Sequence, residues 1–298
     1  MKTAKAFAPS GISSFFEICD REANGTPIND LARVGARGGG FAFEKGVLTN
    51  VTVEDSEKTS VEIYINGRLA PEALTTRRVV EELLENYGSP CRVLVRHKVE
   101  VPVGAGFGTS AAGALTAALA LNEALNLNLT YNGLAMIAHK AEIECKTGLG
   151  TVVPLTVGGF ILTVKPGGPG YALIDRIPIS PDYRLIVGFC GSIYTKEVLT
   201  DEKRREAVNA WGNITLKNIL KDPSLENFLK CCREFARKTG FATKRVEELF
   251  KLADEAGAVG AAQNMVGEAV HAVAYKEDVE RVVEAFNRVL PKEKILVG

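Results

Sequence analysis

The sequence has little of what several functional classes require. Its 298 residues carry no net formal charge, because 36 Lys and Arg residues balance 36 Asp and Glu residues. Surfaces that bind nucleic acid or an anionic membrane usually need an excess of positive charge, so we expect neither partner. No run of about 18 apolar residues is present, and residues 1–10 lack the apolar stretch of a signal peptide. We therefore expect a cytoplasmic protein that acts on small molecules.

Patterns for metal binding and redox chemistry are also scarce. The six cysteines form no C-x-x-C pair and are too few for a disulfide scaffold. Cys231 and Cys232 are neighbours, but the stretch LENFLKCCREFARK has helical periodicity, so we predict that they pack in the core. His97, His139 and His271 form no H-x-x-x-H pair, which gives a histidine metal site little support. We predict that all three histidines are structural.

What is present is ordinary for a globular chain: 46% hydrophobic and 24% charged residues, in a length sufficient for two domains. Up to about residue 180, short β-rich segments alternate with amphipathic stretches. Charged helical patterns dominate from Lys196 to Glu255, and a strand, a helix and a strand follow. These patterns predict an α+β fold with one domain over residues 1–180 and a second, built on a small antiparallel sheet, over residues 181–298.

The stretch PVGAGFGTSAAGALTAALAL, residues 102–121, joins a glycine cluster to a strong helix former. The first N–H groups of a helix have no internal acceptor and lie at the positive end of its dipole, so an anion binds well there. Gly104, Gly106 and Gly108 allow close approach of the backbone to a phosphate and positive φ angles. We interpret the stretch as a phosphate loop; a glycine-rich turn before a core helix is the alternative.

Two common phosphate loops do not fit the spacing. The Walker form needs a lysine before its Ser or Thr, and no lysine lies between Gly104 and Ser110. The dinucleotide form G-x-G-x-x-G would need a glycine at Thr109. Thr109 and Ser110 are instead placed to cap the helix. A third kind of loop is required.

Three stretches, in the right order, resemble the signatures of the GHMP superfamily, which is named after galactokinase, homoserine kinase, mevalonate kinase and phosphomevalonate kinase. PVGAGFGTSAAG resembles its phosphate loop P-x-x-x-G-L-G-S-S-A-A, and AHKAEIECKTGLGTVVPLTVGGF and AGAVGAAQNMVGEAVHAV resemble its second and third motifs. The opening AFAPSGISSFFEI resembles the first strand and turn of the family. The stretches GARGGGF, TGLG and AAQNMVG are most similar to those of archaeal pantoate kinases.

The resemblance implies a GHMP kinase fold with a ferredoxin-like C-terminal domain, and the phosphorylation of pantoate by ATP with Mg²⁺ on the route to coenzyme A. It places Ser110 and Glu142 on the family's metal ligands; a solvated helix carboxylate is the alternative for Glu142. It implies that the ATP phosphates lie on the loop formed by Pro102, Val103, Gly104, Ala105, Gly106, Phe107, Gly108, Thr109, Ser110, Ala111 and Ala112.

The chain departs from the family at the proton acceptor. Mevalonate-type members carry an aspartate seven residues before the Gly-Gly pair, and counting back from Gly158 gives Thr151. Threonine cannot serve as a carboxylate base. Three readings stay open: catalysis without a dedicated base, another group in its place, or an inactive variant. Since phosphoryl transfer depends mostly on positioning and charge stabilisation, we expect activity to survive with Thr151 in the catalytic site.

Substrate contacts are predicted from polar residues in glycine-rich runs. Arg37, in GARGGG, is the candidate for the pantoate carboxylate, because a guanidinium binds a carboxylate through two hydrogen bonds. Gln263 and Asn264 are expected near the phosphates or the acceptor. The alternatives are a surface arginine in a turn and a plain helix-to-strand turn. Other functions kept open are a homoserine or mevalonate-type kinase, a silent ligand-binding regulator and a decarboxylase; a homodimer is also left open.

Overall fold

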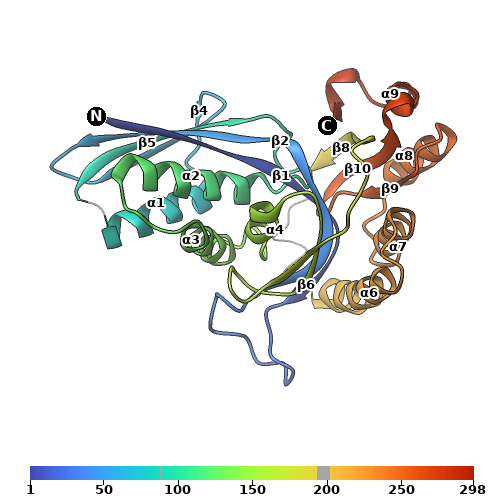
Figure 1. The fold of residues 1–298 in the computed structure, drawn as a ribbon, viewed down its shortest axis with the longest axis horizontal. Helices are drawn as coiled ribbons and strands as arrows, with labels where there is room; N and C mark the ends of the chain where they lie inside the picture. The colour runs from blue at the N-terminus through green and yellow to red at the C-terminus, as the bar shows by residue number, and fades with distance from the viewer. Residues whose placement is uncertain (88, 193–201) are drawn as a thin grey trace.

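Two β-sheets follow one another along the chain in the computed structural model, which describes residues 1–87, 89–192 and 202–298 (Figure 1). The first sheet has the order β4-β3-β5-β2-β6-β7, with β1 paired to β2. Its strands are β1 (Lys2–Cys19), β2 (Gly35–Asp55), β3 (Ser60–Ile65), β4 (Arg68–Leu69), β5 (Cys91–Val99), β6 (Phe160–Lys165) and β7 (Leu173–Arg176). Its helices are α1 (Leu74–Tyr87), α2 (Thr109–Leu125), α3 (Tyr131–Glu144) and α4 (Val152–Val157).

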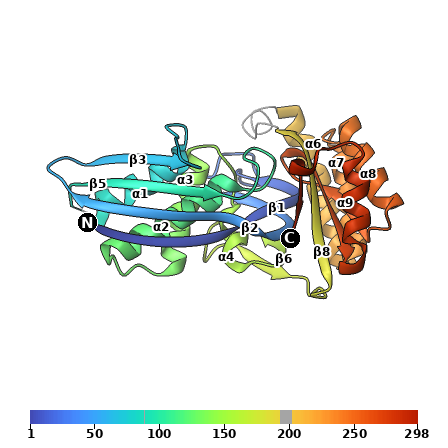
Figure 2. The ribbon, with the colours of Figure 1, turned by 90° about the horizontal axis from the view of Figure 1, so that it is seen from above.

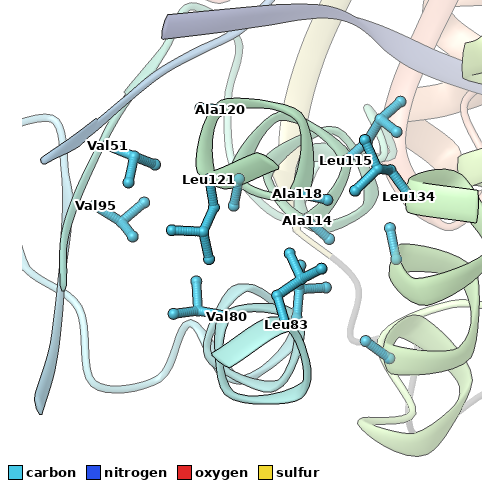
Figure 3. Packing of buried hydrophobic residues seen from close by; sticks show 14 of the residues in the cluster. Val51, Val80, Leu83, Val95, Ala114, Leu115, Ala118, Ala120, Leu121 and Leu134 are labelled. Carbon is cyan, nitrogen blue, oxygen red and sulfur yellow. The ribbon is translucent and has the colours of Figure 1, made fainter. Parts of the chain in front are cut away.

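Helix α2 lies at the centre of the first core, between the sheet and helices α1 and α3 (Figures 1 and 3). Small side chains make this close packing possible: Ala114, Ala117 and Ala118 are fully buried on it. Larger side chains from its surroundings fill the remaining space, including Val51 and Val95 of the sheet (Figure 3). The alanine-rich sequence therefore belongs to a helix that is buried on nearly all sides.

The second sheet has the order β11-β8-β10-β9, and all of its neighbouring strands are antiparallel. Its strands are β8 (Tyr183–Ser192), β9 (Gly260–Gln263), β10 (Gly267–Tyr275) and β11 (Ile295–Val297). Its helices are α6 (Glu202–Lys221), α7 (Leu225–Lys238), α8 (Lys244–Glu255) and α9 (Val279–Asn287), with short 3₁₀ turns at Lys276–Asp278 and Lys292–Lys294. Numbered in chain order, the strands run 4-1-3-2 across the sheet, which is the ferredoxin-like order predicted for this part.

An aromatic cluster joins the two parts of the chain. Phe15 of β1, Phe41 of β2 and Phe160 of β6 pack around Phe228 of α7, with ring centroids 6.0, 5.7 and 4.6 Å from that of Phe228. Figure 2 shows α6 to α9 together at one end of the molecule, opposite to the end at which β3 and β5 begin. The chain passes from the first sheet to the second between β7 and β8. One hydrophobic cluster contains residues from both sides of residue 180. The domain boundary at this residue stays a prediction.

Several expectations need correction. The opening stretch has no turn: β1 is one strand of 18 residues that bends at irregularities between Pro9 and Ser10 and between Ser13 and Phe15. Helix α4 and strand β9 were not predicted, since both are short and lack a clear period. Residues 196–201 of the expected helical stretch lie outside the described residues. No described helix is both long and apolar enough to cross a bilayer.

The shared aromatic cluster predicts that one substitution weakens both parts together. Phe228→Ala removes a fully buried ring and is expected to lower the free energy of unfolding by about 3–5 kcal/mol. Urea unfolding followed by far-UV circular dichroism measures this loss. Phe7→Ala, at a phenylalanine that is 49% exposed, is the matched control and should cost about 1 kcal/mol or less. Equal effects of the two variants would contradict a shared core at Phe228.

Candidate active site

A cavity of about 460 Å³ opens where the glycine-rich loop meets the first sheet. Strands β1, β2 and β6 line one part of it, and the loop before α2 and the segment 145–151 line the rest. Met265 and Val266, which precede β10, also contribute to its wall. A volume of this size suits a small-molecule site, and segments far apart in the sequence meet there.

The glycine-rich loop has the backbone that a phosphate loop needs. Gly104, Gly106 and Gly108 have φ angles of 78°, 76° and 58°, a region that residues with a β-carbon rarely occupy. Gly108 is the N-cap of α2 and the helix has no side-chain cap, so Thr109 and Ser110 are its first residues and not its caps, contrary to prediction. The first N–H groups of α2 therefore stay free for an anion.

Other segments pack so closely on this loop that side chains are excluded. A β-carbon on Gly106 would lie 2.8 Å from Cβ of Asn264, and one on Gly108 would lie 2.7 Å from Cγ2 of Thr151. The N–H of Gly11 in β1 donates to the carbonyl of Phe107 at 3.0 Å. The loop is therefore held on three sides, by β1, by the segment before α4 and by the third motif.

The predicted loop residues divide between the cavity wall and its support. Those that line the cavity are Val103, Gly104, Gly106, Phe107, Gly108, Thr109 and Ser110. Ala105, Ala111 and Ala112 are fully buried and Pro102 is half-buried; none of the four is part of the wall. The cradle is thus narrower than the stretch proposed from the sequence.

Glu142 is not a solvated carboxylate. It is 1% exposed, and its Oε2 accepts hydrogen bonds from the backbone N–H groups of Gly150 at 3.0 Å and Thr151 at 2.9 Å. Burial raises the pKa of Glu142, and the hydrogen bonds from residues 150–152 oppose that shift. The carboxylate anchors the segment 148–151 from behind, while the segment itself forms part of the cavity wall.

Thr151 lies between this carboxylate and the phosphate loop. Its methyl group is the atom nearest to a β-carbon placed on Gly108, and its side chain also hydrogen bonds to Glu142, which helps to lower the pKa of that carboxyl. Thr151 lines the cavity, and its place at the proton-acceptor position of the motif stays a prediction. A hydroxyl used in this way supports the loop and supplies no strong base.

Arg37 lines the cavity and is paired with Glu17. Its Nε donates to Oε2 of Glu17 at 2.9 Å, and Nη2 donates to the same oxygen. The side chains are only 28% and 14% exposed, so the pair is held rigidly at the cavity edge. Arg37 is therefore a cation on the cavity wall that is paired with Glu17 and has donors left over for a ligand.

Gln263 and Asn264, expected near the phosphates or the acceptor, are buried behind the cavity wall. Both are fully buried, and neither lines the cavity among the described residues. Nε2 of Gln263 donates to the carbonyls of Phe241 and Gly267, inside the second part of the chain. Asn264 packs directly under Gly106. Their contact with phosphate or acceptor stays a prediction that these positions do not favour.

A buried chain of hydrogen bonds, missed from the sequence, holds Asn264. Its Oδ1 is 2.8 Å from Nδ1 of His271, and Nε2 of His271 is 2.9 Å from the hydroxyl of Ser14 in β1. Burial lowers the pKa of His271 to about 3, so the ring is neutral and takes part in the network as one donor and one acceptor. Residues 257 apart in sequence form this link, and no local pattern predicts it.

Comparisons with known proteins agree with this geometry. Residues 74–159, which include the loop and α2, match the family described as GHMP kinases N terminal domain. The pantoate kinase of Methanocaldococcus jannaschii is 33% identical over 92% of this chain and 94% of its own. This chain belongs to the GHMP kinases.

Two further similarities extend over the whole GHMP kinase. The pantoate kinase of Thermococcus kodakarensis is 31% identical over 93% of this chain and 89% of its own. A solved structure described as a phosphotransferase related to the CoA biosynthesis pathway superposes with a TM-score of 0.86 at 28% identity. It covers 99% of this chain, and the match covers 98% of that structure. The similarity therefore includes both sheets.

The residues present fit the ATP phosphates better than they fit the predicted metal site. The loop backbone has three glycines with positive φ, two of them packed too closely for a β-carbon, at the start of a long helix with no side-chain cap. For Mg²⁺, the Ser110 hydroxyl lines the cavity, whereas the Glu142 carboxylate lies behind residues 148–151 and binds their N–H groups. Mg²⁺ ligation by Ser110 and Glu142 stays a prediction.

The close packing of Asn264 on Gly106 predicts that one added methyl group strongly weakens ATP binding. Gly106→Ala places a β-carbon against Asn264 at a positive φ, so the loop must move; we expect the affinity for ATP to fall about tenfold or more, equivalent to about 1.4 kcal/mol. Isothermal titration with ATP measures it. Gly25→Ala, at φ 85° with open space around it, is the control for backbone strain alone. Similar ATP affinities in both variants would contradict the cradle.

The buried Glu142 carboxyl predicts a pH-dependent stability. Because burial raises its folded pKa above 4.5, this group stabilises the fold fully below that value, and the contribution is lost as pH rises through the folded pKa. Glu142→Gln cannot titrate and therefore does not lose this contribution. Between pH 4.5 and the folded pKa of Glu142, the free energy of unfolding of the variant relative to wild type should rise by about 1.4 kcal/mol per pH unit. Urea unfolding from about pH 4.5 to about pH 7.5 measures it. Glu123→Gln, on the exposed side of α2, should follow wild type throughout.

Proposed function

We propose that this GHMP kinase transfers the γ-phosphoryl group of ATP to the primary hydroxyl of pantoate, giving 4-phosphopantoate for coenzyme A synthesis. The observation that carries the proposal is the phosphate cradle at the start of α2, open to a cavity whose wall holds two cations. The whole-length similarity to pantoate kinases supports pantoate as the acceptor over other alcohols.

The charges of the cavity suit two anionic reactants. Among its described lining residues, Arg37 and Lys146 are cationic and no residue is Asp or Glu. ATP and pantoate are both anions, and a guanidinium held by Glu17 is a rigid partner for a carboxylate. Pantoate would thus lie between Arg37 and the phosphate loop, with its hydroxyl directed to the γ-phosphorus.

Because the described wall has no carboxylate, we propose a mechanism without a dedicated general base. The hydroxyl oxygen of the acceptor forms the new bond to the γ-phosphorus, and the bond from that phosphorus to the β–γ bridging oxygen breaks. ADP leaves with the bonding electron pair, and the hydroxyl proton passes to an oxygen of the transferred group. In a loose transition state the acceptor needs little activation, so positioning by the loop and the cations carries the catalysis. Mg²⁺, when bound with ATP, would neutralise phosphate charge.

The other candidates are weaker on specific grounds. Homoserine carries an ammonium group, which two wall cations would repel, and mevalonate-type kinases are expected to use the aspartate that Thr151 replaces. A silent regulator would keep the cradle without turnover. The cytoplasmic location and the homodimer stay predictions.

Release of ADP tests the proposal directly. With ATP and Mg²⁺, we expect turnover with pantoate and little with homoserine or mevalonate, measured by a coupled ADP assay. Phosphorus NMR of the product should show a phosphomonoester on the primary hydroxyl. ADP release with mevalonate or homoserine in place of pantoate would overturn the acceptor, and ADP release with none of them would favour the regulator.

The Thr151→Asp variant separates the two mechanisms. It would bring a second carboxylate against buried Glu142, and the two like charges would raise each other's pKa, so we expect no gain in turnover. A dedicated general base is worth about 10²–10⁴ in rate, and a rise of that size would show that wild type is an impaired base-dependent kinase. Thr151→Val keeps the shape and is the control for the lost hydroxyl.

A further inference from the structure

We propose that Lys146 supplies the cation that the phosphate loop itself lacks, and that it acts on the γ-phosphoryl group during transfer. The inference rests on the proposed function. No lysine lies between Gly104 and Ser110, so the loop binds phosphate with backbone N–H groups alone. Lys146 is an exposed residue that lines the same cavity from the segment that follows α3.

The backbone at Lys146 is unusual for a lysine. It has φ 55°, and its N–H donates to the carbonyl of Ile143 at 3.1 Å, so it occupies the left-handed position that ends α3. Glycine or asparagine normally fills that position. The other described non-glycine residues with positive φ are Asn66, Asn126 and Asn128. A lysine here costs backbone energy that asparagine would avoid, so its side chain has a use that offsets the cost.

The charges around Lys146 leave it available. None of the described residues forms an ion pair with it, whereas Arg37 is paired with Glu17. The other polar groups of the described wall near it are uncharged hydroxyls, those of Thr147 and Ser110 among them. An unpaired ammonium beside a phosphate cradle attracts the most negative group that enters, which is the terminal phosphate of ATP.

The role of Lys146 in the transfer is electrostatic. As the β–γ bridging bond breaks and the bond from the acceptor oxygen to phosphorus forms, negative charge spreads over the oxygens of the transferred group. Lys146 stays protonated throughout and balances that charge. The Walker lysine performs this task from within its loop; here the same charge would come from the end of α3.

Lys146→Asn separates a catalytic role from a structural one, because its expected effects on stability and on turnover have opposite signs. Asparagine suits the left-handed backbone, so the melting temperature should stay or rise, while turnover should fall about 10²-fold or more. Lys146→Arg, which keeps the charge, should stay within about tenfold of wild type. Lys140→Gln removes the same charge from α3 at a position outside the described cavity wall and should leave turnover unchanged. Turnover of Lys146→Asn within about threefold of wild type would overturn the proposal.

A binding measurement keeps the test independent of the acceptor. In wild type, a non-hydrolysable ATP analogue should bind more tightly than ADP, and Lys146→Asn should reduce that preference about tenfold. An unchanged preference would refute contact with the γ-phosphate, even if turnover falls. If wild type phosphorylates none of the alcohols, the proposed function fails, while the ratio of the two affinities still decides the role of Lys146.

Discussion

The close approach of three backbone segments around residues 104–108 is the constraint on which the site depends. β1 hydrogen bonds to the loop at Phe107, Thr151 packs on Gly108, and Asn264 packs on Gly106. Since the contacts on Gly106 and Gly108 leave no room for a β-carbon, these two glycines are required both for their φ angles and for their size. The free N–H groups of α2 are useful only because this packing fixes the loop in front of them.

The supports of the loop come from opposite ends of the chain, and this explains why the two sheets share a core. Asn264 is held by His271 of β10, which in turn is hydrogen bonded to Ser14 of β1. Phe228 packs on rings from β1, β2 and β6. A hinge between two independent domains would loosen the cradle, whereas a continuous core keeps the third motif pressed against it.

Charge is divided between the cavity and its surroundings. The acidic groups nearest the site are withdrawn from the described wall: Glu142 lies behind the segment 148–151, and Glu17 is bound to Arg37. Arg37 and Lys146 remain to face the ligands. Thr151 fits this arrangement, because a threonine can bridge Glu142 and the phosphate loop without adding a carboxylate. Two anionic reactants match such a cavity.

The sequence by itself determined the elements that depend on local physics. Periodicity and glycine punctuation predicted the α+β fold, and the unusual spacing of Gly104, Gly106 and Gly108 before an alanine-rich helix predicted an anion site at its start. Motif order was sufficient for the family, because each motif is contiguous. The family resemblance gave Ser110, and the glycine-rich run GARGGG gave Arg37, as residues near the ligand, and both line the cavity.

Only the tertiary structure decided how those residues are used. Glu142 became an anchor for the N–H groups of Gly150 and Thr151, and Gln263 an internal donor, because tertiary packing buries both side chains, which no local spacing encodes. Lys146 was overlooked because a lysine after a helix carries no local signal of a site, and its place on the cavity wall depends on where α3 ends relative to α2. The sequence specified which groups were available, and long-range packing specified which of them the ligands can reach.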